Sequence, residues 1–293
     1  MKLNGLMFFW AALIASSFPV AAAITAENSP LATTFLRFLL ATLLFLPLAA
    51  AKLSWPIRPH ILLRYLIISA TLVLFFVAMF EALRYTSAVN TGAIYTLMPL
   101  VSVVLTFWLL KTVTPRLRVC GFVLGAVGAL LVVLERNSVA LADLTASRGD
   151  LIFFLGSISM AMYSLLSRKW LSEQEPMVAT FWILLFGTVL LAPFAFFDSG
   201  SRSMADWSID YIAGLLYLAV FTTLLTFFIQ QYAIQQVGPN RLLAFSYLTP
   251  ALIGVGEAIW WSETIIGLLP GCGLICLAML LIQRKEAVVK QPA

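Results

Sequence analysis

The side chains with the most chemistry to offer lie inside long apolar stretches of this sequence. Arg37 lies in TTFLRFLLATLLFLPL (33–48), and the adjacent amides Gln230 and Gln231 lie in FFIQQYAIQQ (227–236). Polar groups in apolar surroundings cost free energy unless a partner, water or a ligand satisfies them. We therefore interpret these residues as candidates for binding a polar molecule, with interhelical hydrogen bonds as the alternative for the glutamines.

Residues that enzymes use for acid–base, nucleophilic or metal chemistry are scarce. The one histidine, His60, lies in a basic loop, and the chain has no HExxH, no GxSxG and no intramembrane aspartate pair. The three cysteines, Cys120, Cys272 and Cys276, lie in apolar runs without a second pair or a histidine to complete a zinc site. We expect no enzymatic activity, no metal site and no cofactor.

Composition indicates that lipid surrounds these residues. Hydrophobic residues make up 62% of the 293 residues, charged residues make up 11%, and the mean hydropathy is +1.00. Soluble domains carry about 25% charged residues, so the chain is predicted to be a polytopic membrane protein. The net charge of +5 is scattered among loops, which argues against nucleic acid as a partner. The start resembles a signal peptide but contains Pro19, and we interpret it as the first span.

Ten apolar runs of about 20 residues lie between polar breaks. Backbone groups in lipid must be hydrogen-bonded within their own segment, and barrel strands would alternate over about ten residues, so helices are predicted. The predicted spans are residues 4–24, 31–51, 61–83, 89–110, 117–135, 150–169, 177–197, 209–233, 241–261 and 264–283.

Lysine and arginine residues predict the orientation of these spans. With the N-terminus inside, thirteen of them fall in cytoplasmic segments and four, such as Arg84 and Arg202, fall in outer loops. Cytoplasmic loops of membrane proteins are enriched in these residues. We therefore expect a multi-pass membrane protein with both termini cytoplasmic.

An internal repeat relates the two halves of the chain. PLATTFLRFLLATLLFLPL (30–48) and PMVATFWILLFGTVLLAPF (176–194) align at a constant offset of 146, with matched prolines and with Thr42 opposite Thr188. Each copy has five spans, so the second copy starts on the opposite side of the membrane and the two are inverted. Inverted repeats are typical of secondary transporters, with the substrate site near the midplane between them.

We therefore predict two domains, residues 1–144 and 145–293, which are inverted five-helix repeats around a central cavity. Two similar halves in opposite orientations can exchange conformations, which turns an outward-open state into an inward-open one. One chain already holds both halves, so a monomer suffices.

Several stretches together resemble a known family, the drug/metabolite transporter superfamily of the ten-helix EamA type. They are FFWAALIASSFP (8–19), Pro30 with Arg37 and Phe38, LMPLVSVVLTFWL (97–109), GFVLGAVG (121–128) and LTPALIGVGEAIWWSE (248–263). The overall pattern is most similar to the bacterial amino-acid exporter branch, including exporters of aromatic amino acids.

The chain also departs from the family pattern. Ala11 stands where members often have glycine, and Thr112 stands in the first copy where Glu263 stands in the second. The resemblance implies export of small metabolites, amino acids (aromatic or other neutral ones) foremost, by alternating access. The partners it implies are the small-molecule substrate and membrane lipid.

Polar, aromatic and proline residues within the spans are the candidate site. The carbonyls of Tyr95 and Ser246, four residues before prolines, are expected to lose their helical partners. The candidate substrate-binding residues are Trp10, Ser17, Met79, Tyr95, Met98, Tyr163, Gln230, Gln231, Phe245 and Tyr247, and the candidate gating or structural residues are Pro19, Arg37, Glu81, Pro99 and Pro250.

Arg37 has three interpretations from the sequence. It pairs with Glu81 or with carbonyls in the outer half and shapes an outer gate, it binds a substrate carboxylate, or it extends to the lipid head groups. The second repeat has Ile183 at the matching position, so the two halves need not behave alike.

No acidic residue is central in any predicted span, so no buried proton-relay carboxylate is evident. We therefore expect a neutral or zwitterionic substrate and loose coupling to protons. A flippase for lipids or lipid-linked sugars, and a multidrug or other metabolite exporter of the same superfamily, stay open as alternatives. Direction of flux, coupling and the exact substrate are also left open.

Overall fold

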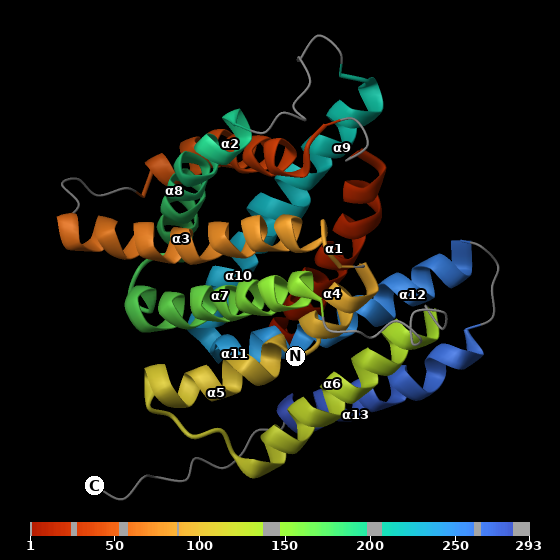
Figure 1. Ribbon diagram of the computed structural model, residues 1–293. Coiled ribbons are helices and arrows are strands. Elements are labelled where there is room, and N and C mark those ends of the chain that lie inside the picture. The colour runs from red at the N-terminus through yellow and green to blue at the C-terminus, as the bar shows by residue number, and fades with distance from the viewer. Residues whose placement is uncertain are drawn as a thin grey trace, which may run out of the picture.

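The computed structural model describes residues 2–24, 28–52, 58–86, 88–136, 147–197, 207–260 and 265–283. Every regular element in these ranges is a helix, so the predicted all-α membrane fold is confirmed. Long helices pack side by side and across one another in a single bundle (Figure 1).

The helices of the first half follow the apolar runs closely. Two of them begin with proline at the first helical position, where a missing N–H costs nothing, and the hydroxyl of Ser29 caps one by accepting from the Ala32 N–H at 3.0 Å. The elements are α1 (Lys2–Ile24), α2 (Pro30–Ala50), α3 (Pro59–Ala82), α4 (Ala88–Tyr95), α5 (Met98–Leu110) and α6 (Arg116–Arg136).

The helices of the second half are more often interrupted. The elements are α7 (Arg148–Leu171), α8 (Pro176–Phe196), α9 (Ile209–Ala219), the π-helical η3 (Val220–Leu225), α10 (Thr226–Val237), α11 (Pro239–Leu243), the 3-10 segment η4 (Ala244–Tyr247), α12 (Leu248–Trp260), the 3-10 turn η5 (Ile266–Leu268) and α13 (Leu269–Gln283). A left-handed Gly238, with φ of 84°, separates α10 from α11.

Nine helical segments of the described residues are long and apolar enough to cross a membrane. The predicted spans 89–110 and 241–261 are not single straight helices: the first breaks between α4 and α5, and the second consists of α11, η4 and α12. In both places the irregular turn lies just before a proline, Pro99 or Pro250, which removes a backbone donor and clashes with the preceding turn. The prolines therefore interrupt these two spans, as their positions predict.

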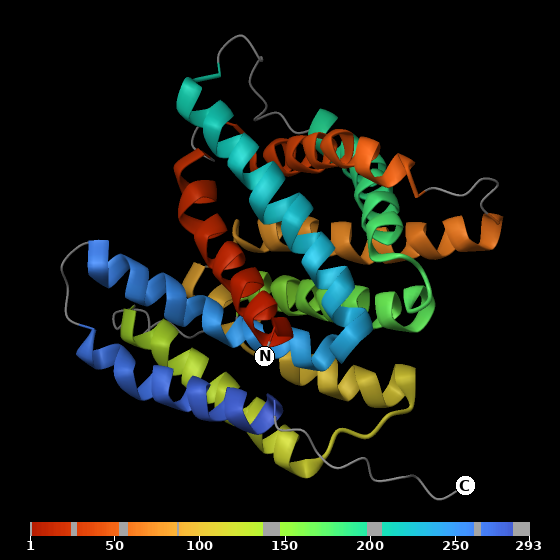
Figure 2. The same ribbon diagram turned by 180° about the vertical axis from the view of Figure 1, so that it is seen from behind.

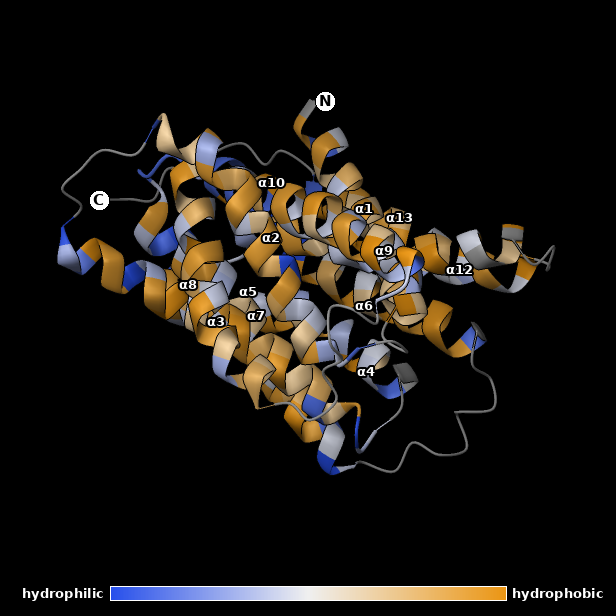
Figure 3. Ribbon diagram, turned by 90° about the horizontal axis from the view of Figure 1, so that it is seen from above, coloured by the Kyte–Doolittle hydropathy of each residue, from blue (hydrophilic) through white to orange (hydrophobic). Residues whose placement is uncertain are grey.

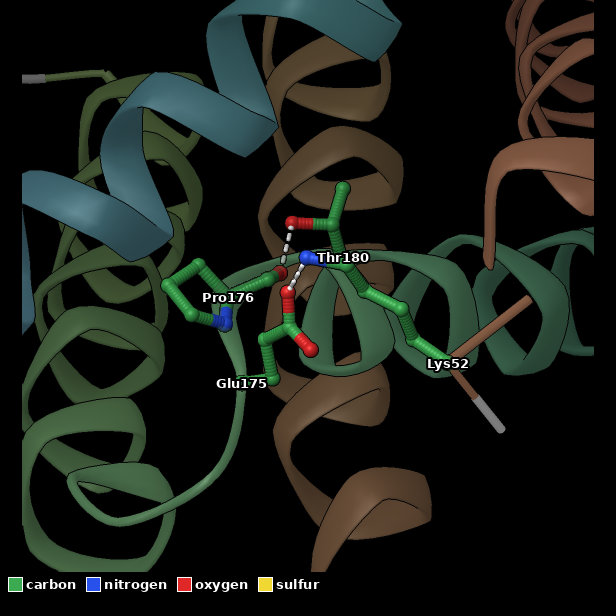
Figure 4. A network of polar contacts seen from close by, with 4 residues as sticks. All are labelled: Lys52, Glu175, Pro176 and Thr180. Carbon is green, nitrogen blue, oxygen red and sulfur yellow. Dashed lines mark hydrogen bonds and ion pairs between the residues drawn. The ribbon is translucent and has the colours of Figure 1, made fainter. Parts of the chain in front are cut away.

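α2 and α8 cross the bundle side by side in opposite directions (Figure 1). At one end the rings of Phe35 and Phe196 lie 6.0 Å apart, and at the other end Lys52, just after α2, forms an ion pair with Glu175, just before α8. Figure 4 shows this second end, where the Thr180 hydroxyl also donates to the carbonyl of Pro176 at 2.7 Å. The helix pair is thus tied at both ends.

α6 and α13 form a second close pair, visible as adjacent yellow-green and dark-blue helices (Figure 2). A Cβ atom on Gly128 would lie 2.8 Å from the Gly271 carbonyl oxygen, and one on Gly271 would lie 2.7 Å from the Gly128 carbonyl oxygen. Small residues let helix backbones approach closely in membranes, where packing rather than water drives association. The two glycines therefore set the spacing of this pair.

Hydrophobic residues dominate most of the helices (Figure 3), and many large apolar side chains are exposed on the outside of the bundle. Trp108, Leu280 and Phe197 are 70%, 69% and 88% exposed, respectively. Such exposure is unfavourable in water and natural in lipid, which agrees with a membrane-spanning bundle. The largest core cluster lies inside, where α2, α3, α7 and α8 meet.

Candidate functional site

Arg37 on α2 points toward the π-helical segment η3. Its Nε donates to the Thr223 hydroxyl and its Nη2 donates to the Thr222 hydroxyl, both at 3.2 Å. Both threonines are buried, and Arg37 itself is partly buried. A π-helical turn widens a helix locally and often marks a functional site. This turn presents two neighbouring hydroxyls to one guanidinium group.

The predicted pairing of Arg37 with Glu81 is wrong. Glu81 accepts instead from Arg84, three residues later at the end of α3, at 3.0 Å and on the exposed surface. A partner one turn away on the same helix is available to Glu81 at little entropic cost. Within the described part of the chain, two neutral hydroxyls hold the Arg37 guanidinium, in place of the expected carboxylate or carbonyls.

The charge of Arg37 is consequently not neutralised by any acid that the structure describes. The ion pairs among the described residues are Lys52–Glu175 and Arg84–Glu81. A cation away from bulk water gains much from a nearby anion, because the effective dielectric is low there. Within the described residues, this guanidinium therefore has hydrogen-bond partners but no counter-ion.

The two predicted glutamines both bond to α7. Gln231 Nε2 donates to the Tyr163 hydroxyl at 2.8 Å and to the Ser167 hydroxyl at 3.2 Å, and Gln230 Nε2 donates to the Ser164 hydroxyl at 3.3 Å. All of these side chains are buried. The interhelical interpretation of the glutamines is therefore confirmed for their amide nitrogens.

One polar atom of this cluster stays unsatisfied. Gln231 Oε1 is buried and has no hydrogen-bond partner within the described part of the chain. A buried unpaired acceptor is costly, and such an atom in a native protein commonly receives a water or a ligand donor. Gln231 thus offers an acceptor to a bound molecule while its nitrogen fixes its direction.

An aromatic ring lies between Arg37 and Gln231. The Phe227 ring on α10 lies 5.6 Å from the ring of Phe38, which follows Arg37, and 6.2 Å from the ring of Tyr163. Eight residues separate Thr223 from Gln231, or about 12 Å along the helix axis. The hydroxyl that holds Arg37 and the Gln231 amide therefore start from positions about two helical turns apart.

Other predicted residues lie in separate parts of the core. Trp10 packs with Phe245 in a cluster of α1, α10, α11 and η4, and the Trp10 Nε1 atom has no partner among the described residues. Met98 is fully buried and Met79 and Tyr95 partly buried in the largest cluster, which also holds Tyr163. Among the described residues, these side chains are therefore divided between two core clusters.

Tyr247 and Ser17 make bonds that are structural. The Tyr247 hydroxyl donates to the Phe122 carbonyl of α6 at 2.9 Å, and a Cβ on Gly125 would lie 2.5 Å from its ring. The Ser17 hydroxyl donates to the Ile14 carbonyl at 2.6 Å, in the turn before Pro19. Tyr247 therefore anchors η4 against α6.

A cavity of about 270 Å³ lies at one end of the bundle and was not predicted. The loop after α5, the start of α6, the end of α7 and the α10–α11 connection line it. The lining residues are Thr106, Leu110, Thr112, Val113, Thr114, Pro115, Arg118, Phe122, Arg168, Val237, Gly238, Pro239, Asn240 and Arg241. The sequence signal that could have indicated this cavity is the presence of arginines at the ends of three different spans. Glu263, the counterpart of Thr112, lies outside the described residues.

The sequence model of the EamA-like transporter family matches residues 3–134 and again residues 147–284. The chain belongs to this family. Among its relatives, the uncharacterized transporter YyaM of Bacillus subtilis is 28% identical over 207 residues, 67% of this chain and 68% of that protein. An uncharacterized transporter of Archaeoglobus fulgidus is 25% identical over 236 residues, 78% of each chain.

A solved crystal structure shares the fold of this EamA-like protein, with a TM-score of 0.75 over 95% of both chains at 18% identity. Membership makes the protein a multi-pass membrane transporter of small molecules. The relatives are named transporters, which fits the expectation of no enzymatic activity. Neither name states a substrate, so placement in the aromatic-amino-acid branch stays a prediction.

Proposed function

We propose that this EamA-like transporter carries small zwitterionic or anionic metabolites, amino acids (aromatic or other neutral ones) foremost, and that Arg37 binds their carboxylate. One observation carries the proposal: the Arg37 guanidinium is held by the neutral hydroxyls of Thr222 and Thr223. A guanidinium matches a carboxylate in a two-point geometry, and two hydroxyls orient it without neutralising it. A substrate carboxylate would supply the missing charge.

We further propose that transport follows alternating access of two inverted repeats, residues 1–144 and 145–293, in a bacterial-type inner membrane with both termini cytoplasmic. The double match of the family model supports two similar halves. Equivalent threonines also behave alike, because Thr34 donates to the Pro30 carbonyl at 2.8 Å as Thr180 does to Pro176 at 2.7 Å. The direction proposed is export.

Counterflow in proteoliposomes tests the substrate class. Vesicles loaded with an unlabelled neutral amino acid should accumulate the labelled one, and Arg37→Gln should raise the half-saturating concentration about tenfold or more. The amide of the same amino acid lacks the carboxylate, so the wild type should exchange it more weakly than the acid. Exchange of the amide should differ little between Arg37→Gln and the wild type. Arg64→Gln removes a charge at an exposed position of α3 and serves as the matched control.

Two outcomes would contradict the proposal. If Arg37→Gln weakens exchange of the acid and of its amide equally, the guanidinium supports the fold and does not read the carboxylate. If the wild type exchanges no amino acid but moves lipid between leaflets, the flippase alternative replaces it. The arginine-lined cavity is the observation that keeps that alternative open.

A further inference from the structure

The end cavity differs from the rest of the bundle in its charge. Arg118, Arg168 and Arg241 are among its fourteen lining residues, and none of those fourteen is acidic. Arg118 and Arg241 lie near enough for their charges to repel each other. Like charges brought together on a cavity wall are destabilising until an anion lies between them.

Hydrogen bonds hold two of these arginines in place at the cavity. Arg168 Nη1 donates to the carbonyls of Ile234 and Gln235 in the last turn of α10, and the Ile234 carbonyl also accepts from the Gly238 N–H at 3.0 Å. Arg241 donates to the side-chain oxygen of Gln283 from Nε at 3.2 Å and from Nη2 at 2.7 Å. Each guanidinium has five N–H donors, so both keep donors beyond these contacts.

Asn240 is turned so that its donor group is left for the cavity. Its Oδ1 accepts from the Ser102 hydroxyl at 2.6 Å and from the Thr106 hydroxyl at 2.8 Å, which occupies the acceptor side of the amide. Its amide nitrogen has no partner among the described residues. The hydroxyls of Thr112 and Thr114 complete the polar lining.

We propose that this cavity binds a phosphate group, supplied either by the head group of an anionic lipid or by a free phosphate. Three guanidinium groups, one oriented amide and no acid make a wall of donors around a space too large for a bare chloride. Arginine forks match the several oxygens of a phosphate, and basic pockets between membrane helices bind anionic head groups. The two arginines that repel each other gain most from the shared anion.

This inference goes beyond the proposed transport site. The cavity residues lie on α5, α6, α7, α10 and α11, whereas Arg37 and its threonines lie on α2 and η3. Binding is measured directly, so the outcome does not depend on which substrate the protein carries.

The test measures phosphate and lipid binding to the purified full chain. Inorganic phosphate should raise the Tm of the detergent-solubilised wild type, and native mass spectrometry should show phosphatidylglycerol retained over phosphatidylcholine. Arg118→Gln and Arg241→Gln should each weaken both effects about tenfold or more. Arg116→Gln removes the same charge two residues away at an exposed position of α6 and should bind like the wild type.

Charge-retaining variants separate binding from folding. Arg118→Lys and Arg241→Lys should keep a Tm near that of the wild type and recover part of the binding, because the positive charge stays while the forked geometry is lost. Retention of phosphatidylglycerol without any effect of inorganic phosphate would assign the site to a lipid head group, and both effects together would assign it to phosphate in general. Absence of both in the wild type, or equal binding by Arg118→Gln, Arg241→Gln and Arg116→Gln, would overturn the proposal.

Discussion

The hydroxyls of Thr42 on α2 and Thr188 on α8 lie 3.2 Å apart and share a hydrogen bond. Each hydroxyl also contacts the carbonyl four residues earlier in its own helix, Phe38 at 2.7 Å and Leu184 at 2.8 Å. The two positions are 146 residues apart, the offset of the internal repeat. If the two halves are the inverted repeats proposed above, this contact between equivalent residues lies on their pseudo-two-fold axis.

Replacing both threonines by valine should reveal this contact as a coupling. Interhelical hydrogen bonds in membranes contribute about 0.6 kcal/mol on average, and valine keeps the shape of threonine while removing the hydroxyl. A double-mutant cycle of Thr42→Val and Thr188→Val, measured by unfolding in mixed micelles, should give a coupling of about that size. The cycle of Thr34→Val with Thr180→Val is the control, because their hydroxyls bond within their own helices and should show additive effects.

Gly125→Ala should destabilise the protein by about 1–3 kcal/mol, because a Cβ there would lie 2.5 Å from the Tyr247 ring. Tm measurements in detergent would show the loss, and Tyr247→Leu in the same chain should recover part of it by making space. Gly273→Ala is the matched control on α13, since nothing lies within 4 Å of its added Cβ. Gly273→Ala should leave the stability unchanged or slightly raise it, because alanine is more favourable than glycine within a helix. Equal losses for Gly125→Ala and Gly273→Ala would contradict the packing role of Tyr247.

Gln231→Met should separate stability from transport. Methionine removes both the donor to Tyr163 and the unpaired Oε1, so the change in unfolding free energy should stay within about 1 kcal/mol. Transport should fall markedly if the substrate donates to Oε1, as measured by counterflow at matched protein levels. Gln236→Met is the control: it replaces an exposed glutamine on the same helix, α10, and should preserve transport. Full activity in Gln231→Met would exclude a substrate contact at this residue.

The double variant Thr222→Val/Thr223→Val should be less stable than the single variant Arg37→Met. The threonine variant leaves a guanidinium without the hydroxyls that hold it, whereas Arg37→Met removes the charge together with its need for partners. We expect the first to cost about 1–3 kcal/mol and the second to be close to neutral or stabilising. Chemical unfolding of both variants would check the order, and the reverse order would mean that another group holds Arg37.

The order of the spans and the all-helical class follow from the sequence by itself. Apolar runs of span length leave the backbone no partner but its own helix, and proline marks where two spans break. The sequence positions of Pro99 and Pro250 likewise predict irregular turns, and the apolar surroundings of Arg37 predict that its charge needs a partner.

Which groups meet was decided only by the tertiary structure. The pairing of Arg37 with Thr222 and Thr223 joins segments 185 and 186 residues apart. The sequence does not give the direction in which each helix face points, so it could not exclude Glu81 as the partner of Arg37. Arg118 and Arg241 likewise each look like ordinary loop-end charges in the sequence. They line one cavity because α6 and α11 bring their ends together, and helix packing in the bundle, which no single segment encodes, sets that approach.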